Sequence, residues 1–237
     1  MSDEEPPKRR WTGKPKGGDG QRQMQTRVKN KKLDESSRNW VKRHLNDPYV
    51  ARARADGYRA RAAYKLIELD EQFHFLKRGM KVIDLGAAPG GWAQVAVQRG
   101  AGKVVGVDLL EIEPLNGASF FQLDLLDEAT PSILINALGG APDLVLSDMA
   151  ANTTGHARTD QIRTGALADA AADFALAHVA PGGAFVTKAF QGGLDAALLQ
   201  RLKQNFVKVS HAKPPASRAE SSEVYVVAMG RKSQSSA

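Results

Sequence analysis

Several acidic residues of this sequence follow short apolar runs, where they are well placed to hold a ligand. Together with the lysine that ends a fifth run, they are Asp84, Asp108, Asp124, Asp148 and Lys188. In open sheets of parallel strands, ligands bind outside the carboxyl ends of the strands. A single acid of this kind is as often a helix cap or a turn residue. Four in series predict one polar sheet edge that binds a ligand.

The first of these runs leads into a glycine-rich turn that opens a helix, with Gly86 and Gly90 in the turn and Trp92 just beyond it. Glycines lack a Cβ and let the backbone approach a ligand closely. Their spacing here departs from the G-x-G-x-x-G pattern of dinucleotide sites, which argues against a nicotinamide dehydrogenase. The acid Asp84 would repel a diphosphate but attract a cation, and S-adenosylmethionine carries an ammonium and a sulfonium. We therefore predict S-adenosylmethionine as the cofactor.

Two of the other acids suit the nucleoside part of that cofactor. Asp108 lies 24 residues beyond Asp84, close to the offset of about 20 residues at which an acid commonly binds ribose hydroxyls. Asp124 follows the next apolar run, and its carboxylate could accept a hydrogen bond from an adenine amino group. The cofactor contacts that the residues themselves predict are Asp84, Gly86, Gly90, Asp108 and Asp124.

The elements that would position these residues alternate between strand and helix patterns, which predicts an α/β fold built on a parallel sheet. Two helices are expected before the first strand. The expected strands are 81–85, 103–107, 119–123, 143–147, 183–187, 206–210 and 224–229, and the expected helices are 91–99, 127–138, 164–179 and 194–204. No helix fits between the last two strands, so the final strand should be antiparallel to the others. That direction would bring its first residue, Glu223, to the polar edge.

Composition narrows the class of protein. The chain has 237 residues and no cysteine, which removes disulfides and zinc-thiolate sites. Its five histidines lack metal-ligand spacing, so we expect no metal. No run approaches the about 20 apolar residues of a membrane span, and no secretory signal is apparent. We expect a soluble, cytoplasmic monomer that does not bind membranes.

The net charge of +7 is concentrated at the N-terminus. Residues 1–65 carry 18 Lys and Arg against 8 Asp and Glu, whereas the remainder carries 15 against 18. Such asymmetry indicates a polyanionic partner, most simply nucleic acid, although a solubilising tail would look similar. We predict a disordered basic extension at 1–35, a main domain at 36–232 with a basic helical RNA-binding lead-in at 36–78, and a tail at 233–237.

The lead-in interleaves basic and aromatic side chains that suit phosphate contacts and base stacking. They are Arg52, Arg54, Arg59 and Arg61, with Tyr49, Tyr58 and Tyr64. An ordinary amphipathic helix with a charged face would show the same pattern.

Taken together, these stretches resemble the FtsJ/RrmJ family of ribose 2′-O-methyltransferases, which act on a uridine of large-subunit ribosomal RNA. The resemblance covers about residues 37–232. The stretches that carry it are Ser37-Arg38 with Trp40, Tyr58 to Leu66, Val82 to Trp92, Ser147 to Ala150, Ala180 to Gly183, Lys188 to Gly192, and Ser217-Arg218 with Ser222 to Tyr225.

The resemblance implies a Rossmann-like class I methyltransferase fold with a seven-stranded, mostly parallel sheet and helices on both faces. It places the family's catalytic tetrad on Lys65, Asp148, Lys188 and Glu223, and family cofactor positions on Gly90, Trp92, Asp108, Asp124 and Asp148. It implies S-adenosylmethionine as methyl donor and 23S ribosomal RNA, within the large subunit, as partner. Transfer RNA or a messenger RNA cap are alternative substrates. A non-catalytic RNA-binding protein of ribosome assembly is an alternative of another class.

The role of Lys188 stays open at this level. An unperturbed lysine is neutral only about one part in a thousand at pH 7.4, so a lysine base needs help from its surroundings. Lys65 and burial would favour the neutral amine, whereas Asp148 and Glu223 would favour the ammonium. Lys188 therefore either accepts the proton of the ribose hydroxyl or orients that hydroxyl as a cation.

Overall fold

The computed structural model describes residues 41–42, 45–151, 157–190 and 196–233. Asp47–Ala237 forms one compact unit, and Met1–Asn46 forms another, of which only residues 41, 42, 45 and 46 are described. The predicted extension at 1–35, the first part of the lead-in and residues 234–237 of the tail lie outside the described residues. The domain boundaries therefore stay predictions.

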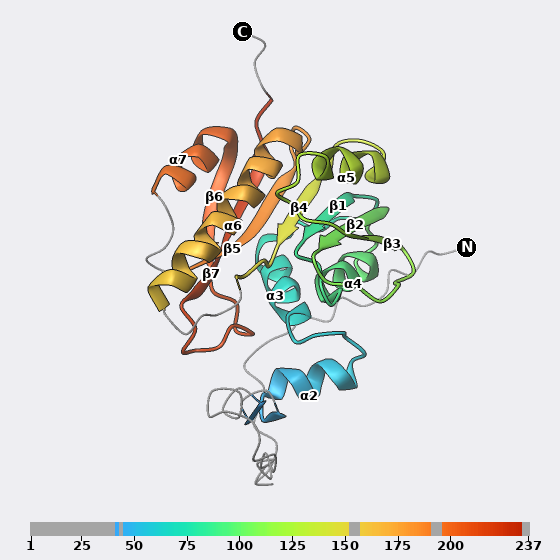
Figure 1. Ribbon diagram of the computed structural model, residues 1–237, viewed down its shortest axis with the longest axis vertical. Helices are drawn as coiled ribbons and strands as arrows, with labels where there is room; N and C mark the ends of the chain where they lie inside the picture. Colours follow the sequence, from blue (N-terminus) through green and yellow to red (C-terminus); the bar gives the residue numbers. More distant parts are fainter. Residues whose placement is uncertain (1–40, 43–44, 152–156, 191–195, 234–237) are drawn as a thin grey trace, which may run out of the picture. The chain divides into compact units, whose positions relative to one another are not determined.

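The described part of the chain contains a seven-stranded sheet in the order β3-β2-β1-β4-β5-β7-β6 (Figure 1). The strands are β1 Lys81–Leu85, β2 Lys103–Asp108, β3 Ala118–Gln122, β4 Leu144–Ser147, β5 Ala184–Phe190, β6 Phe206–Ala212 and β7 Glu223–Arg231. Strand β7 lies between β5 and β6 and is antiparallel to both, whereas β1 to β5 pair in parallel. The predicted fold class and the reversed last strand are confirmed.

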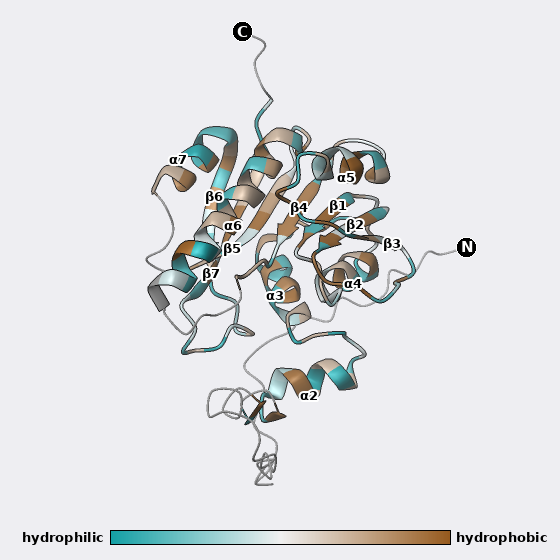
Figure 2. Ribbon diagram, in the orientation of Figure 1, coloured by the Kyte–Doolittle hydropathy of each residue, from teal (hydrophilic) through white to brown (hydrophobic). Residues whose placement is uncertain are grey.

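Helices cover both faces of the sheet. They are α3 Ala63–Phe73, α4 Gly91–Gln98, α5 Thr130–Leu138, α6 Ala157–His178 and α7 Ala196–Asn205, whereas α2 Pro48–Ala55 packs against α3. Helices α3 and α4 pack on one face, and α5, α6 and α7 pack on the other. The central strands are apolar on both sides because each side is covered (Figure 2).

Helix boundaries differ from the sequence prediction in two places. Helix α5 begins at Thr130 rather than at 127, because the chain first makes turns in which Asp127 N–H donates to Asp124 and Thr130 N–H donates to Asp127. Helix α6 begins at Ala157 rather than at 164. Its first turns are polar, and Ile162 is 66% exposed, so they carry no apolar period that sequence reading detects.

In the described ranges, no helix is both long and apolar enough to cross a membrane.

Leu134 of α5 tests the core on this side of the sheet. Its side chain is fully buried among residues of β1, β2 and α6, so Leu134→Ala should lower the free energy of unfolding by about 2–5 kcal/mol. Urea denaturation followed by circular dichroism measures the change. Ile133→Ala is the control, because Ile133 lies next to Leu134 on the same helix but is 38% exposed. Equal losses in the two variants would contradict the packing.

Candidate active site

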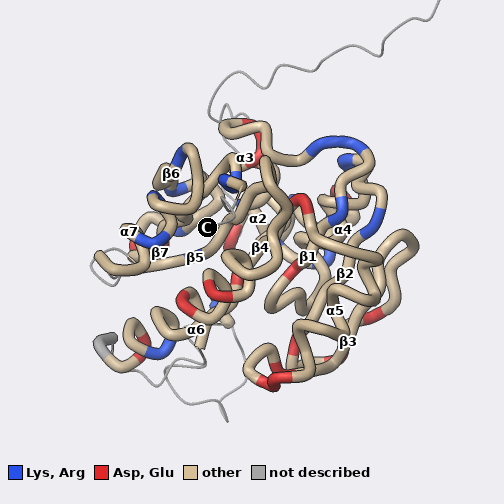
Figure 3. Tube along the Cα trace, turned by 90° about the horizontal axis from the view of Figure 1, so that it is seen from above, with Lys and Arg blue, Asp and Glu red and all other residues tan. Residues whose placement is uncertain are grey.

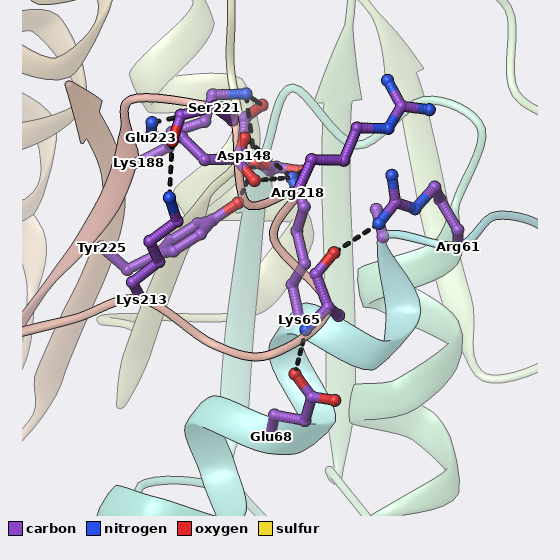
Figure 4. Close-up of polar contacts among 12 residues, drawn as sticks. Arg61, Lys65, Glu68, Asp148, Lys188, Lys213, Arg218, Ser221, Glu223 and Tyr225 are labelled. Carbon is purple, nitrogen blue, oxygen red and sulfur yellow. Dashed lines mark hydrogen bonds and ion pairs between the residues drawn. The ribbon is translucent and has the colours of Figure 1, made fainter. Parts of the chain in front are cut away.

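The sheet brings four ionisable residues from distant parts of the chain to one rim (Figure 4). Asp148 follows β4, and Lys188 lies near the end of β5. Glu223 is the first residue of β7 and reaches the same rim because that strand runs in the opposite direction. Lys65 lies in the first turn of α3 and reaches this rim through its contact with Glu223. The structure therefore brings together all four residues of the predicted tetrad.

Their side chains form a continuous chain of polar contacts. The Lys65 Nζ lies 3.0 and 2.9 Å from the two carboxylate oxygens of Glu223 and 3.9 Å from Asp148 Oδ2. The Lys188 Nζ donates to the Asp148 backbone oxygen at 2.6 Å and lies 3.1 Å from Asp148 Oδ1. Each side chain is at most 17% exposed. Two lysines and two carboxylic residues thus meet at a nearly closed site.

Tyr225 completes this group and was missed as a site residue from sequence. It is fully buried, and its hydroxyl donates to Asp148 Oδ1 at 2.7 Å. The Lys65 Nζ lies 5.7 Å from the centre of its ring. A signal was available, because Tyr225 lies two residues after Glu223 and alternate strand residues share a face.

The surroundings of Asp148 and Tyr225 shift the pKa values of the two groups in opposite directions. Burial alone would raise the pKa of Asp148, but Lys188, Lys65 and the Tyr225 hydroxyl outweigh it and leave that pKa below its ordinary value. Burial, together with the Asp148 and Glu223 carboxylates, holds the pKa of Tyr225 well above its ordinary value. Asp148 is therefore a persistent anion that accepts a hydrogen bond from a neutral phenol.

The glycine loop between β1 and α4 has no room for side chains at two positions. A Cβ at Gly86 would lie 2.4 Å from Met149 Cγ, and one at Gly90 would lie 2.7 Å from an Arg59 nitrogen. Both glycines have positive φ, at +75° and +99°, which L side chains rarely adopt. Gly90 also begins α4 with no side-chain cap. Gly90 therefore supplies no side chain to cap the first amides of α4, and among these amides the Ala93 N–H faces the Asp84 carboxylate.

The Trp92 side chain faces the interior and not a ligand. Its ring is 3% exposed and packs 5.7 Å from the ring of Tyr225. The indole N–H donates to the Ala62 carbonyl at 2.8 Å, which joins α4 to the start of α3. Trp92 therefore joins α4 to the segment before α3 and to β7.

Asp108 and Asp124 stand at neighbouring strand ends but differ in their hydrogen bonds. Asp108 ends β2, and its two oxygens accept from the Ala88 and Leu110 amides, each at 2.9 Å. Asp124 follows β3 by two residues and accepts from the Leu126 amide at 2.9 Å through Oδ1. Asp108 thus ties the glycine loop to the end of β2 and keeps lone pairs for hydroxyl donors.

Asp84 lies deeper than the other acids. It is 1% exposed, and neither carboxylate oxygen accepts a hydrogen bond of regular geometry from the described residues. Burial raises the pKa of Asp84 to about 8, and the Asp148 carboxylate adds to the rise, which the Ala93 backbone N–H opposes. Asp84 and Asp148 therefore differ in charge near neutral pH, although both are aspartates on adjacent strands.

Three of the four arginines predicted to contact RNA make contacts within the chain, and Arg52 does so through an ion pair with Asp56 at 3.5 Å. Arg59 donates to the backbone oxygens of Pro89, Glu113 and Pro114 at 2.6–3.3 Å. Arg61 forms an ion pair with Asp47 at 2.7 Å. Tyr49, Tyr58 and Tyr64 pack ring against ring, with neighbouring centroids 5.5 Å apart. Arg52 and Arg54 remain on the surface.

The basic residues of the described chain do not gather in one patch. Lys and Arg segments lie in separate places, including the surroundings of α4 and of β6 (Figure 3). Across the described ranges, no three His, Asp or Glu residues are grouped so as to hold a metal ion.

Comparison with known proteins agrees with this geometry. Residues 58–231 match the model of the family described as FtsJ-like methyltransferase. The chain is 58% identical over 218 residues to the ribosomal RNA large subunit methyltransferase E of Mesorhizobium japonicum, covering 90% of this chain and 82% of that protein. It is 56% identical over 224 residues to the protein of the same name from Sphingopyxis alaskensis, covering 94% and 97%.

A solved structure extends the likeness to the fold. A Plasmodium falciparum protein described as a ribosomal RNA methyltransferase superposes with a TM-score of 0.67 at 28% identity. The match covers 75% of this chain and all of that one.

The raised pKa of Asp84 predicts a pH-dependent stability. In the unfolded chain an aspartate loses its proton near pH 4, whereas the folded protein keeps that proton until about pH 8. Between these values the folded state binds the extra proton, so this group makes the free energy of unfolding fall as pH rises. Asp84→Asn removes the effect, so its stability relative to the parent should grow from pH 5 to pH 8, by at most about 1.4 kcal/mol per pH unit.

Urea denaturation at several pH values measures this difference. Asp173→Asn is the control, since Asp173 lies on α6 with its side chain 64% exposed. A constant difference between Asp84→Asn and the parent across this pH range would refute the prediction.

Proposed function

This chain belongs to the FtsJ-like methyltransferase family, and we propose that it transfers a methyl group from S-adenosylmethionine to a ribose. The acceptor is the 2′-hydroxyl of a uridine in 23S ribosomal RNA of the large subunit. The membership bears out the resemblance seen in the sequence. The observation that carries the proposal is the convergence of Lys65, Asp148, Lys188 and Glu223 beside a glycine loop with no room for side chains.

The loop and the strand ends next to it fit the methyl donor. The start of α4, whose N-cap residue Gly90 has no side chain, suits the carboxylate of the donor's methionine part. Asp108 would take the ribose hydroxyls and Asp124 the adenine amino group, through the lone pairs that their backbone contacts leave free. Asp84, buried without a regular hydrogen bond, would ionise beside a cationic group. When bound, the donor supplies an electrophilic methyl on its sulfonium.

Lys188 is placed to take the proton that the hydroxyl loses. A neutral amine has two N–H donors and one lone pair. Two contacts of Lys188 are spent on Asp148, one on its backbone oxygen and one on its carboxylate. The remaining tetrahedral direction is then free to accept a proton. Lys188 therefore acts as the general base, while Asp148 holds the amine and stabilises the ammonium that forms.

Lys65 and Glu223 form the other half of the rim. The Glu223 carboxylate is paired with Lys65 through both oxygens, which leaves further lone pairs for the acceptor ribose. The pair thus orients the hydroxyl toward the methyl group without itself taking the proton. Positioning of this kind and general base catalysis, the latter worth about 10²–10⁴-fold, are the two contributions that these side chains can make.

The cellular setting of the proposal follows from its substrate. The relatives named above carry the words ribosomal RNA large subunit in their names, so we propose the large ribosomal subunit as partner and the cytoplasm as location. A monomeric state stays a prediction.

Methyl transfer to ribosomal particles tests the function directly. Large subunits from cells that lack this protein should accept labelled methyl from S-adenosylmethionine, and nuclease mapping should place it on one ribose 2′-oxygen of a uridine in 23S RNA. Asp148→Asn should lower the rate by at least about 10²-fold, because it removes the anion that holds Lys188. Transfer RNA and capped messenger RNA are the comparison substrates. Labelling of either in preference to the subunit, or RNA binding without cofactor affinity, would point to the alternatives.

Substitution of Lys188 tests its role as base. Lys188→Arg keeps a cation but gives a group that does not lose its proton near neutral pH, so single-turnover transfer should fall by about 10²-fold or more. Cofactor affinity, measured by calorimetry, should stay near that of the parent. Full turnover by Lys188→Arg would rule out the base and leave Lys188 as a charged orienting group.

A further inference from the structure

A buried carboxylate outside the rim collects two arginines from distant parts of the chain. The Asp47 side chain is 7% exposed and caps α2 by accepting from the Tyr49 amide at 3.0 Å. Its Oδ2 pairs with Arg61 at 2.7 Å and with Arg218 at 3.2 Å. Arg61 precedes α3, and Arg218 lies in the loop between β6 and β7. One carboxylate therefore joins three segments of the chain.

A second set of contacts ties the same loop to α3. The Ala216 amide donates to Glu68 Oε2 at 2.6 Å, and the Tyr49 hydroxyl donates to Glu68 Oε1 at 3.0 Å. Arg61 also donates to the Ala216 carbonyl. Ala216 itself is fully buried. The middle of the loop is therefore fixed through both its backbone and its Arg218 side chain.

The loop runs from there directly into the tetrad. Lys213 donates to the backbone oxygens of Ala219 at 3.1 Å and Ser221 at 2.6 Å, which closes the loop on itself. The Glu223 amide donates to the Ser221 hydroxyl at 3.2 Å. Glu223 is thus held at the end of a loop whose own anchors lie on α2 and α3.

The geometry of α3 connects the two ends of this loop. Lys65 and Glu68 are three residues apart on one helix and therefore share a face. Lys65 binds Glu223 at the end of the loop, and Glu68 binds Ala216 in its middle. A shift of the loop relative to α3 would disturb both contacts.

We propose that Asp47, Arg61, Arg218 and Glu68 form a positioning clamp that holds loop 213–222 on α3 and so keeps Glu223 in contact with Lys65. The inference rests on the proposed function for its effect on catalysis, but the clamp itself is a property of the free protein. The four residues are positioning residues, because each acts through the loop rather than on the ribose.

Read from sequence, Arg61 suggests an RNA ligand, and Arg218 is a second basic residue beside it, but the structure favours the clamp. A phosphate ligand needs an accessible guanidinium, but the Arg61 and Arg218 side chains are 16% and 29% exposed and already share a buried anion. The two readings predict opposite effects at Asp47. Removal of its charge would loosen a clamp, whereas it would free two arginines for phosphate.

Three variants in the full-length protein distinguish these readings. Asp47→Asn keeps an oxygen to cap α2 but loses the charge that holds the arginines. Arg218→Gln removes one arginine. Asp173→Asn is the matched control, since it removes one partner of the ion pair between Asp173 and Arg201 on α6 and α7, away from the rim. Thermal unfolding of each variant establishes that it is folded at the assay temperature.

Amide hydrogen exchange measures the stability of the clamp without requiring the enzymatic reaction. The amides of 213–222, including that of Ala216, should exchange about tenfold faster or more in Asp47→Asn and Arg218→Gln, because their opening no longer breaks the ion pairs. Asp173→Asn should exchange there like the parent. Unchanged exchange in both clamp variants would overturn the proposal, even if methyl transfer by the parent proves absent.

The rate of single-turnover methyl transfer measures the effect of the clamp on catalysis. Both clamp variants should lose about tenfold or more in rate, since displacement by about 1 Å can cost 10²-fold, with cofactor affinity unchanged. In a Glu223→Gln background the further loss from Asp47→Asn should largely disappear, because the clamp acts through Glu223. If Arg218→Gln instead weakens RNA binding and its salt dependence while Asp47→Asn turns over normally, the arginines contact RNA and the clamp is wrong.

Discussion

The reversed direction of β7 is the constraint on which the site depends. Parallel strands present their carboxyl ends at one rim, and an added parallel strand would have placed its first residue at the opposite rim. Because β7 is inserted antiparallel between β5 and β6, Glu223 opposes Phe190, and Tyr225 opposes Lys188 in the pairing. A carboxylate and a phenol thereby join the strand-end residues. The seven-residue pairing of β5 with β7 fixes this register, because a slip by one residue would turn Tyr225 to the other face.

Around this rim the charges are arranged so that none is buried alone. Asp148 is approached by Lys188, Lys65 and Tyr225. An ionised carboxylate at low exposure is costly unless it is paired and hydrogen-bonded, and the two lysines and the Tyr225 hydroxyl meet that need. The same contacts leave Lys188 with an unused direction and Glu223 with unused lone pairs. The contacts that stabilise the buried charges are therefore the same ones that leave Lys188 and Glu223 able to bind a substrate group.

The sequence predicts which residues lie at the strand ends, but it does not predict the contacts between the helices and the sheet. The acids at strand ends and the reversal of the last strand followed from local pattern, because each depends on a few adjacent residues. The contact of Lys65 with Glu223 depends on how α3 folds over the rim, which no local pattern encodes. Arg59 and Arg61 look like RNA ligands in a basic stretch, but their partners are backbone oxygens far away in the chain and the nearby acid Asp47. A basic stretch in a sequence indicates an anionic partner, but only the fold shows whether that partner is a group of the protein itself or a separate molecule.

The two aspartates on β1 and after β4 illustrate how one rim can serve two partners. Asp84 and Asp148 are near enough for each charge to be felt, yet the pKa of Asp84 is raised and that of Asp148 is lowered. The difference arises because the lysines and Tyr225 lie on the side of Asp148, whereas Asp84 lies behind the glycine loop with apolar neighbours on β1. Titratable groups whose surroundings move their pKa values apart commonly take different roles. In the proposed function, Asp148 would therefore remain an anion for the lysines on the acceptor side, while Asp84 would hold its proton until a cationic group arrives on the cofactor side.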